Sequence, residues 1–372
     1  MHIVHLYKDY APVLGGIEGH LKTLAEGLVR RGFRITVVVC QPQGRTLPAF
    51  EMVHGVRLIR LPRDMDIASN AWSFAIVATI RELAPDVLHL QMPWPAGDVV
   101  ARLLPNIPLV VSYQSDVIRQ RWLLYMYAPL LRWTLRHARA ILVSSQRYAE
   151  TSPWLADVQN RVRVVPLGIA DPLQEHPRSV RISRTLPQRY VLWVGRMRYY
   201  KGLDTLIRAF QYVTEPTHLV LVGHGPYEEK LRGMAMECGV ADRVIWLGDV
   251  PEEELSHIRA AALCFAFPSQ LRSEAYGIAL LEAIASGIPA ISCEIGTATS
   301  VINQHGVTGL VIPPNDPAAC ARAIQMLCDD PLVRARYSTA ARARYLAEYG
   351  VEKMVDSVSA VYREITRQEE SR

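Results

Sequence analysis

Two glutamates on either side of an expected helix start, Glu274 and Glu282, are placed to bind hydroxyl groups. Gly277 lies between them and should open the helix, which leaves the amides of Ile278 and Ala279 free to hold a phosphate. Glu282 follows one turn later, where its carboxylate could accept hydrogen bonds from both hydroxyls of a ribose. Glu274 precedes the helix and would face the group beyond the phosphates. Because both carboxylates repel a phosphate, they suit a ligand with a sugar on each side of a diphosphate.

Two cations stand at the end of another expected strand, residues 191–194. Gly195-Arg196 follows this strand directly, and Lys201-Gly202 begins the next helix. Two permanent cations at a strand's carboxyl end supply the charge that a departing diphosphate needs, without a metal ion. Solvent-exposed cations are the simpler interpretation. The two glutamates also have simple ones, as a dipole partner of a first turn and a solvated helix residue. The glycine beside each cation favours a site.

Glycine pairs follow two further expected strands. Gly15 and Gly16 come after strand 2–6 and open a helix, and Gly223 and Gly225 end a strand in the second half of the chain. Small residues let the backbone approach a phosphate or a sugar closely, although a glycine pair alone is usually only a turn.

Short β-branched runs alternate with helical patterns along the whole chain, which predicts parallel sheets covered by helices. A segment over 168–189, rich in Pro, Arg and Ser, separates two sets of six strands and is the expected linker. A helix over 317–328 should begin at Pro317, with Asn315 or Asp316 as its cap. The strands are expected at residues 2–6, 35–39, 87–90, 109–112, 140–143, 162–165, 191–194, 219–222, 244–247, 263–267, 289–292 and 310–312.

The predicted architecture is therefore α/β, with two Rossmann-like parallel-sheet domains facing across a cleft. We expect an N-terminal domain over 1–170 and a C-terminal domain over 171–349. Residues 350–372 should form a C-terminal helix that packs back on the N-terminal domain, because apolar residues recur there at helical spacing. Ligands of open α/β sheets lie beyond the carboxyl ends of the strands, so the site is expected in the cleft.

The composition is that of a folded globular protein. Of the 372 residues, 50% are hydrophobic and 21% are charged, and there is no low-complexity tract. The six cysteines are scattered and suit reduced thiols in a cytoplasm. The chain begins in a strand without the pattern of a signal peptide, and no apolar run reaches the roughly 18 residues of a membrane span. A cytoplasmic protein is expected.

Positive charge is concentrated in the first half of the chain. Residues 1–170 carry 19 Lys and Arg against 12 Asp and Glu, whereas residues 171–372 carry 22 against 24. A basic half suits nucleic acid, an anionic membrane or an anionic substrate. No segment resembles a nucleic-acid-binding motif, so nucleic acid is not an expected partner.

Residues 119–139 mix basic and aromatic side chains. Such a stretch suits peripheral docking on the anionic inner face of the cell membrane. A pair of core helices broken at Pro129 explains it equally well. The residues concerned are Arg119, Arg121, Trp122, Tyr125, Tyr127, Arg132, Trp133, Arg136 and Arg139.

Taken together, these motifs resemble glycosyltransferase family 4, which has the GT-B fold, over nearly the whole chain. The resemblance implies a retaining, metal-independent hexosyltransferase that needs no cofactor beyond a nucleotide sugar donor. It implies that Arg196 and Lys201 hold the diphosphate, Glu282 the ribose and Glu274 the hydroxyls of the donor sugar. It also places Gly15 and Gly16 at the site, and the backbone of Gly223 and Gly225 near the base. The resemblance further implies that the N-terminal domain over 1–170 is acceptor-binding and the C-terminal domain over 171–349 is nucleotide-sugar-binding.

The N-terminal segments resemble bacterial polysaccharide mannosyltransferases. GDP-mannose is therefore the first donor expected, with UDP-sugars as alternatives. The acceptor implied is a saccharide or a lipid-linked saccharide in the synthesis of a cell-surface polysaccharide.

Two glutamines, Gln91 and Gln114, stand where the resemblance implies histidines. An amide donates and accepts hydrogen bonds but cannot carry a proton, so Gln114 is no general base. In the mechanism proposed for retaining relatives, the departing phosphate oxygen takes the acceptor's proton, and the enzyme contributes position and charge. Gln114 would then bind a sugar hydroxyl. Asp116 is an alternative polar group, or the cap of the following helix.

Three other interpretations stay open. Asp64-Met65-Asp66 matches a metal-binding DxD motif, but it lies in a connecting segment rather than after a buried strand. A nucleotide-sugar epimerase of the same fold would not need Arg196 with Lys201 and Glu274. A non-catalytic partner that binds nucleotide sugar without turnover is suggested by the two glutamines.

Overall fold

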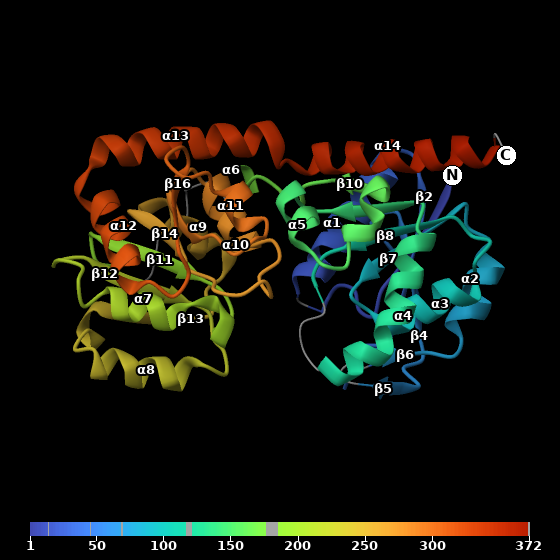
Figure 1. Ribbon diagram of the computed structural model, residues 1–372, viewed down its shortest axis with the longest axis horizontal. Helices are drawn as coiled ribbons and strands as arrows, with labels where there is room; N and C mark the ends of the chain where they lie inside the picture. The colour runs from blue at the N-terminus through green and yellow to red at the C-terminus, as the bar shows by residue number, and fades with distance from the viewer. Residues whose placement is uncertain (14, 45, 68–69, 117–120, 176–184, 371–372) are drawn as a thin grey trace. The chain divides into compact units, whose positions relative to one another are not determined.

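The computed structural model describes residues 1–13, 15–44, 46–67, 70–116, 121–175 and 185–370. The chain divides into two compact units, each of which has a mainly parallel sheet with helices packed around it (Figure 1). Unit 1 comprises Met1–Gly168 and Val351–Arg372, and unit 2 comprises Ile169–Gly350.

The sheet of unit 1 is parallel except at one edge. Its strands run in the order β10-β9-β8-β7-β1-β2-β4-β3, and the β3–β4 pair is antiparallel. The order reverses between β1 and β7, where Ile3 lies opposite Val87. The strands of unit 1 are β1 (His2–Leu6), β2 (Arg34–Cys40), β3 (Phe50–Val53), β4 (Val56–Leu61), β5 (Met65–Ile67), β6 (Asn70–Trp72), β7 (Val87–Met92), β8 (Leu109–Tyr113), β9 (Ala140–Val143) and β10 (Val162–Val164).

The helices of unit 1 include the last one of the chain, which packs against the first. Gly27 of the first helix lies so close to Val355 of the last that a Cβ there would be 2.3 Å from Val355 Cγ2. The last helix buries an apolar face that includes Met354, Val358 and Tyr362. The helices of this unit are α1 (Gly16–Arg30), α2 (Ile76–Leu83), α3 (Pro95–Leu103), α4 (Arg121–His137), α5 (Gln146–Thr151), the 3-10 helix Ala156–Arg161, and α14 (Val351–Glu370).

A single helix, α4, runs through Pro129, so the alternative of two helices broken at this residue is wrong. Proline removes one backbone donor and normally kinks or ends a helix. Here Ala128, Leu131 and Leu135 are buried on one face of α4. Their burial outweighs the loss of one hydrogen bond.

Unit 2 has an all-parallel sheet in the order β13-β12-β11-β14-β15-β16. This is the Rossmann order, in which the direction of winding reverses between β11 and β14. The strands of unit 2 are β11 (Tyr190–Val194), β12 (His218–Val222), β13 (Val244–Gly248), β14 (Cys264–Phe267), β15 (Ala290–Cys293) and β16 (Gly309–Ile312).

The helices of unit 2 cover this sheet, and the last two of them along the chain are long. Asp316 caps the first of these by accepting a hydrogen bond from Ala319 N at 2.8 Å, as one of the two expected capping residues. The helices are α6 (Pro172–Glu175), the 3-10 helix Tyr199–Lys201, α7 (Leu203–Ala209), α8 (Glu228–Glu237), the 3-10 helix Ala241–Arg243, α9 (Glu252–Ala261), α10 (Ile278–Ala285), α11 (Thr299–Ile302), α12 (Pro317–Asp329) and α13 (Pro331–Glu348).

The central strands of both units are covered on both faces and are almost wholly buried. In β11, Val191, Leu192 and Trp193 are all 0% exposed, and β14 is buried from Cys264 to Phe267. Strands of this kind read as short continuous apolar runs, which is why the sequence reveals them. The predicted α/β class with parallel sheets is confirmed.

Candidate active site

The cations and the carboxylates expected at the site follow two neighbouring strands of unit 2. Arg196 and Lys201 lie in the segment after β11, and Glu274 lies in the segment between β14 and α10. The strand order reverses between β11 and β14, so the connections after these strands leave in opposite directions and open a crevice. The topology therefore brings the two sets of residues to one place.

The segment that carries Arg196 is fixed against the segment after β12. Gly195 N donates to Val222 O at 3.0 Å, and Met197 N donates to His224 O at 2.9 Å. Gly223 makes this approach possible, because a Cβ there would lie 2.2 Å from Gly195 O. Between these two hydrogen bonds, Arg196 is exposed and has no hydrogen-bond or ion-pair partner within the described residues. Its guanidinium is therefore available to a ligand.

The segment that carries Lys201 is in turn held against the segment after β14. Gly202 has a φ of +71°, and a Cβ on it would lie 1.8 Å from the carbonyl oxygen of Pro268. Gln270 N also donates to Tyr200 O at 2.9 Å. Only glycine fits this contact without a shift of the backbone.

Replacing Gly202 with alanine should lower the free energy of unfolding of unit 2 by about 3 kcal/mol or more, because left-handed backbone strain and a steric clash add up. Gly239 is a matched control, since its φ is +67° and a Cβ there meets nothing within 4 Å. Gly239→Ala should cost only the strain, about 1 to 2 kcal/mol. Equal losses in denaturant unfolding of the two variants would contradict the contact with Pro268.

Lys201 and Glu274, predicted separately as donor-binding residues, contact each other. Lys201 Nζ lies 2.5 Å from Glu274 Oε2, and the two side chains are 15% and 11% exposed. Ser269 Oγ also donates to Glu274 Oε2 at 3.1 Å. The ammonium lies 5.3 Å from the centroid of the Phe267 ring, which is a cation–π distance. Both charged groups are thus held at the crevice by neighbours on β14 and the segment after it.

Gly277 is the N-terminal cap of helix α10 and has a φ of +93°. Ile278 and Ala279 occupy its first turn, where backbone amides have no acceptor within the helix. These amides and the positive end of the helix dipole follow Glu274 along the chain. The start of α10 is therefore suited to a phosphate, as the sequence suggests.

Glu282 lies one turn into α10 and is paired with a buried arginine that sequence reasoning missed. Arg259 Nη2 donates to Glu282 Oε2 at 2.9 Å. The Glu282 side chain keeps 30% of its surface exposed, although its environment is poorly solvated. Burial raises the pKa of Glu282, and the charge of Arg259 opposes this rise. One oxygen of Glu282 is thus committed to the protein.

The expected base-binding glycines flank a histidine with its own partner. His224 Nδ1 lies 2.9 Å from Glu228 Oε2, and this hydrogen bond raises the pKa of the His224 imidazole. A Cβ on Gly225 would lie 2.2 Å from Met197 O, so this backbone also packs against the segment that carries Arg196. The backbone around Gly223 and Gly225 is thereby held at the carboxyl end of β12.

In unit 1, Gly15 and Gly16 lie at the start of α1, as expected. The Glu18 side chain turns back over this start, because a Cβ on Gly15 would lie 2.1 Å from Glu18 Oε2. Burial raises the pKa of Glu18. A carboxylate in this place repels a phosphate, so the start of α1 suits sugar hydroxyls better than phosphate oxygens.

The two unexpected glutamines form one pair. Gln114 Nε2 donates to Gln91 Oε1 at 2.7 Å, from the neighbouring strand ends of β8 and β7. Gln91 is 0% exposed, and its Nε2 has no hydrogen-bond partner within the described residues. Asp116 Oδ1 accepts from Tyr113 Oη at 3.1 Å and from Ser152 Oγ at 2.7 Å. Gln114 is therefore oriented by Gln91 beside an aspartate that is bound to its own neighbours.

Comparison with known proteins identifies the family. Residues 14–171 match the model described as Glycosyltransferase Family 4, and residues 179–344 match the one described as Glycosyl transferases group 1. The D-rhamnosyltransferase WbpZ of Pseudomonas aeruginosa is 38% identical over 93% of this chain and 91% of that protein. The O-antigen chain mannosyltransferase C of Escherichia coli is 33% identical over 97% and 98%. The chain belongs to glycosyltransferase family 4.

The fold of this family 4 glycosyltransferase is GT-B, as expected from the resemblance. Sucrose-phosphate synthase from Thermosynechococcus elongatus superposes with a TM-score of 0.80 at 21% identity, over 99% of each chain. At this identity the likeness shows the fold alone.

In the DxD motif of this glycosyltransferase, both carboxylates accept hydrogen bonds from other groups of the protein. Asp64 Oδ2 accepts a hydrogen bond from Phe74 N at 2.7 Å. Arg63 binds both oxygens of Asp66 at 3.0 Å and holds the pKa of that carboxyl below its usual range. Each carboxylate therefore has a structural partner.

The basic and aromatic stretch over 119–139 lies largely on α4. Tyr125 and Met126 are 84% and 74% exposed, and the Arg132 guanidinium lies 5.5 Å from the Trp154 ring centroid. Arg139 is paired with Glu369 at 2.7 Å. Arg119 lies outside the described residues. Over the described part of the chain, every helix is too short or too polar to cross a membrane.

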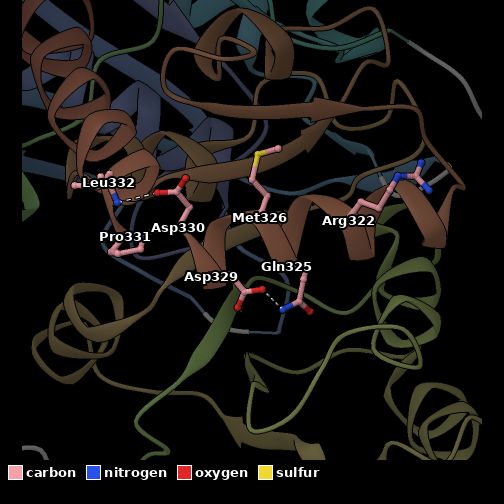
Figure 2. A pocket seen from close by; sticks show the side chains of 7 residues that line it. All are labelled: Arg322, Gln325, Met326, Asp329, Asp330, Pro331 and Leu332. Carbon is pink, nitrogen blue, oxygen red and sulfur yellow. Dashed lines mark hydrogen bonds between the residues drawn. The ribbon is translucent and has the colours of Figure 1, made fainter.

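A groove on unit 2 lies at the junction of α12 and α13 and is separate from these residues (Figure 2). Arg189, just before β11, donates to Cys328 O at 3.0 Å, so this end of α12 is near the amino end of β11. The candidate site follows the opposite, carboxyl end of β11. The groove is lined by Arg322, Gln325, Met326, Asp329, Asp330, Pro331 and Leu332.

Proposed function

We propose that this glycosyltransferase moves a hexosyl group from a nucleoside diphosphate sugar to a saccharide acceptor, with retention at the anomeric carbon and without a divalent metal. The observation that carries the proposal is the arrangement after β11 and β14. There, Lys201 contacts Glu274 and the guanidinium of Arg196 has no partner within the described residues. Cations at this place offset the charge that develops on a departing diphosphate.

Each side chain of unit 2 has a part in this scheme. Arg196 and Lys201 bind the diphosphate, whose phosphates also accept hydrogen bonds from the amides at the start of α10. Glu274 binds hydroxyls of the donor sugar, and Glu282 binds the ribose. As the bond from the anomeric carbon to the phosphate oxygen breaks, the acceptor hydroxyl attacks on the same face and gives its proton to that oxygen. The protein supplies position and charge, and no protein group needs to carry the proton.

Unit 1 contributes polar groups for sugar hydroxyls. Gln114, held by Gln91, donates and accepts hydrogen bonds without titrating. The start of α1, with Glu18 turned over Gly15, is suited to a sugar rather than to a phosphate. These groups place the reacting sugar and the acceptor.

The first donor to consider is GDP-mannose. Two relatives that match nearly the whole chain are named as a mannosyltransferase and a D-rhamnosyltransferase. The name of the first also mentions O-antigen chains, which supports a growing surface polysaccharide as acceptor.

The proposal is tested by release of nucleoside diphosphate from a panel of GDP- and UDP-sugars, with a chelator and a candidate saccharide acceptor present. We expect one donor to be used, release that depends on the acceptor, and a product whose anomeric configuration by NMR matches the donor. Loss of activity on chelation would overturn the proposed metal independence, and an inverted product would overturn the proposed retention. Binding without any product would favour a non-catalytic nucleotide-sugar-binding partner, above all if Gln114→His then created activity.

We also propose that α4 docks peripherally on an anionic membrane when the acceptor is lipid-linked. Tyr125 and Met126 are largely exposed, and basic residues lie on the same helix. The Tyr125→Ser, Met126→Ser double variant should reduce sedimentation with phosphatidylglycerol vesicles several-fold. Met52→Ser is a control, because Met52 is 66% exposed on β3. Equal sedimentation of the double variant and the wild type would contradict docking through α4.

A further inference from the structure

A buried arginine on α9 lies between two carboxylates. Arg259 is 1% exposed, and its guanidinium donates from Nη2 to Glu282 Oε2 at 2.9 Å and from Nη1 to Glu252 Oε1 at 2.7 Å. Glu252 is on the first turn of the same helix and is 46% exposed, and Glu282 is on α10 and is 30% exposed. The guanidinium thus joins a surface carboxylate to the carboxylate expected to bind the ribose.

The group formed by Arg259, Glu252 and Glu282 has one positive and two negative charges when all three are ionised, which leaves one negative charge. A guanidinium keeps its proton at all ordinary pH values, so Arg259 stays charged although it is buried. One cation shared by two carboxylates does not neutralise both. Glu282 therefore keeps negative charge while its Oε2 is fixed in place, and Oε1 is the oxygen left for a ligand. A fixed, charged acceptor binds hydroxyl groups more strongly than a mobile or neutral one.

We propose that Arg259 is a positioning residue for the donor nucleotide: by holding Glu282 in one orientation and in its ionised form, it sets the discrimination for ribose hydroxyls. Glu252 anchors the guanidinium from the other side. The inference rests on the proposed role of Glu282 in binding the ribose, and it adds a residue of α9 that does not touch the ligand itself.

The proposal predicts opposite effects of the two partners on the pH dependence of binding. Burial and the charge of Glu252 raise the pKa of Glu282, whereas Arg259 lowers it, and these are the charged groups that act on it within the described residues. Removing Arg259 raises this pKa further, so binding of hydroxyls should be lost at a higher pH as the pH falls. Removing the charge of Glu252 lowers the pKa and should shift this loss to a lower pH.

The test compares the dissociation constants of GDP and UDP with those of their 2′,3′-dideoxy analogues, measured by calorimetry between pH 5.5 and 8. The full chain is used, as wild type, Arg259→Met, Arg259→Lys and Glu252→Gln. For the nucleotide that binds, the wild type should prefer the ribose form by about 10-fold or more. Arg259→Met should reduce this preference to less than about 3-fold at pH 6, and Arg259→Lys should restore part of it.

Arg344→Met is the matched control. Arg344 is 13% exposed and is paired at 2.8 Å with Glu348, which is 45% exposed, so it resembles the Arg259–Glu252 pair. It lies on α13 and is not part of the site. This variant should lose stability but keep the wild-type preference for ribose. If it loses the preference as Arg259→Met does, Arg259 acts only through the stability of the unit.

The outcomes separate this inference from the proposed function. If neither GDP nor UDP binds the wild type, the donor site itself is wrong, and Arg259 has no ribose to position. If one of them binds but the dideoxy analogue binds equally well, Glu282 does not read the ribose, and the inference is overturned alone. If Arg259→Met does not fold, Glu252→Gln decides, because a loss of binding that does not move to lower pH contradicts the proposal.

Discussion

Replacing Arg196 with alanine should lower the turnover of the donor sugar by about 10²- to 10³-fold and leave the unfolding temperature unchanged. The loss is that of one group that stabilises charge in the transition state. The unfolding temperature is expected to stay because the exposed Arg196 side chain has no hydrogen-bond or ion-pair partner within the described residues. Steady-state release of nucleoside diphosphate and thermal unfolding measure the two effects.

Lys201→Met should reduce turnover to a similar extent but should also destabilise unit 2. Glu274, 11% exposed, would lose the partner that lies 2.5 Å away. Arg208 is exposed on α7, so Arg208→Ala is a control for Arg196→Ala, and Lys230→Met is a control for Lys201→Met. Turnover close to that of the wild type in both Arg196→Ala and Lys201→Met would show that the diphosphate is bound elsewhere.

Replacing Val355 with aspartate should unfold unit 1 and leave unit 2, which carries the proposed donor residues, intact. Val355 is 0% exposed on α14 and lies against Gly27 of α1. A carboxyl buried there without a partner should cost about 4 kcal/mol or more, a large part of the stability of a domain. Transfer should be lost, whereas nucleotide binding should remain, because the proposed donor residues of α9, α10 and the segment after β11 lie in unit 2.

Calorimetry with and without nucleotide measures this prediction, since each unit should give its own unfolding transition. Ser357→Asp is the matched control, because Ser357 is on the exposed face of the same helix. In this variant, the free energy of unfolding of each unit should stay within about 0.5 kcal/mol of the wild-type value. Loss of nucleotide binding in Val355→Asp would show that unit 2 depends on α14, contrary to the packing described.

Most of the strands that could be predicted from the sequence are apolar because the sheet buries them. All twelve expected strands are present. Ten of them are largely buried and have the continuous hydrophobic runs of parallel strands covered on both faces, whereas the edge strands β10 and β13 are only partly buried. The strands that were missed lie at or near an edge. In β4, Arg57 and Arg60 interrupt the apolar run, and the buried Arg60 is paired with Glu51 at 2.7 Å and donates to Pro48 O at 2.9 Å. Helix α13 was also missed, since the buried residues along it are few, with Tyr337, Ala341 and Tyr345 among them.

Only part of the candidate site could be predicted from the sequence. Glycines beside Arg196 and Lys201 are local signals that the sequence shows directly. Contacts between distant segments leave no such local signal, because they depend on which strands become neighbours. The pairing of Lys201 with Glu274 follows from the adjacency of β11 and β14, and the Gln91–Gln114 pair follows from that of β7 and β8. Arg259 gives no signal, since an arginine on a helix is usually exposed.

The most direct test of the account is a crystal structure with a nucleoside diphosphate sugar bound, grown in the presence of a chelator. We expect the diphosphate within hydrogen-bond distance of Arg196, Lys201 and the amides of Ile278 and Ala279, with the ribose at Glu282. A donor bound with its diphosphate away from both cations, or bound only when a divalent metal is supplied, would contradict the proposed site and its metal independence.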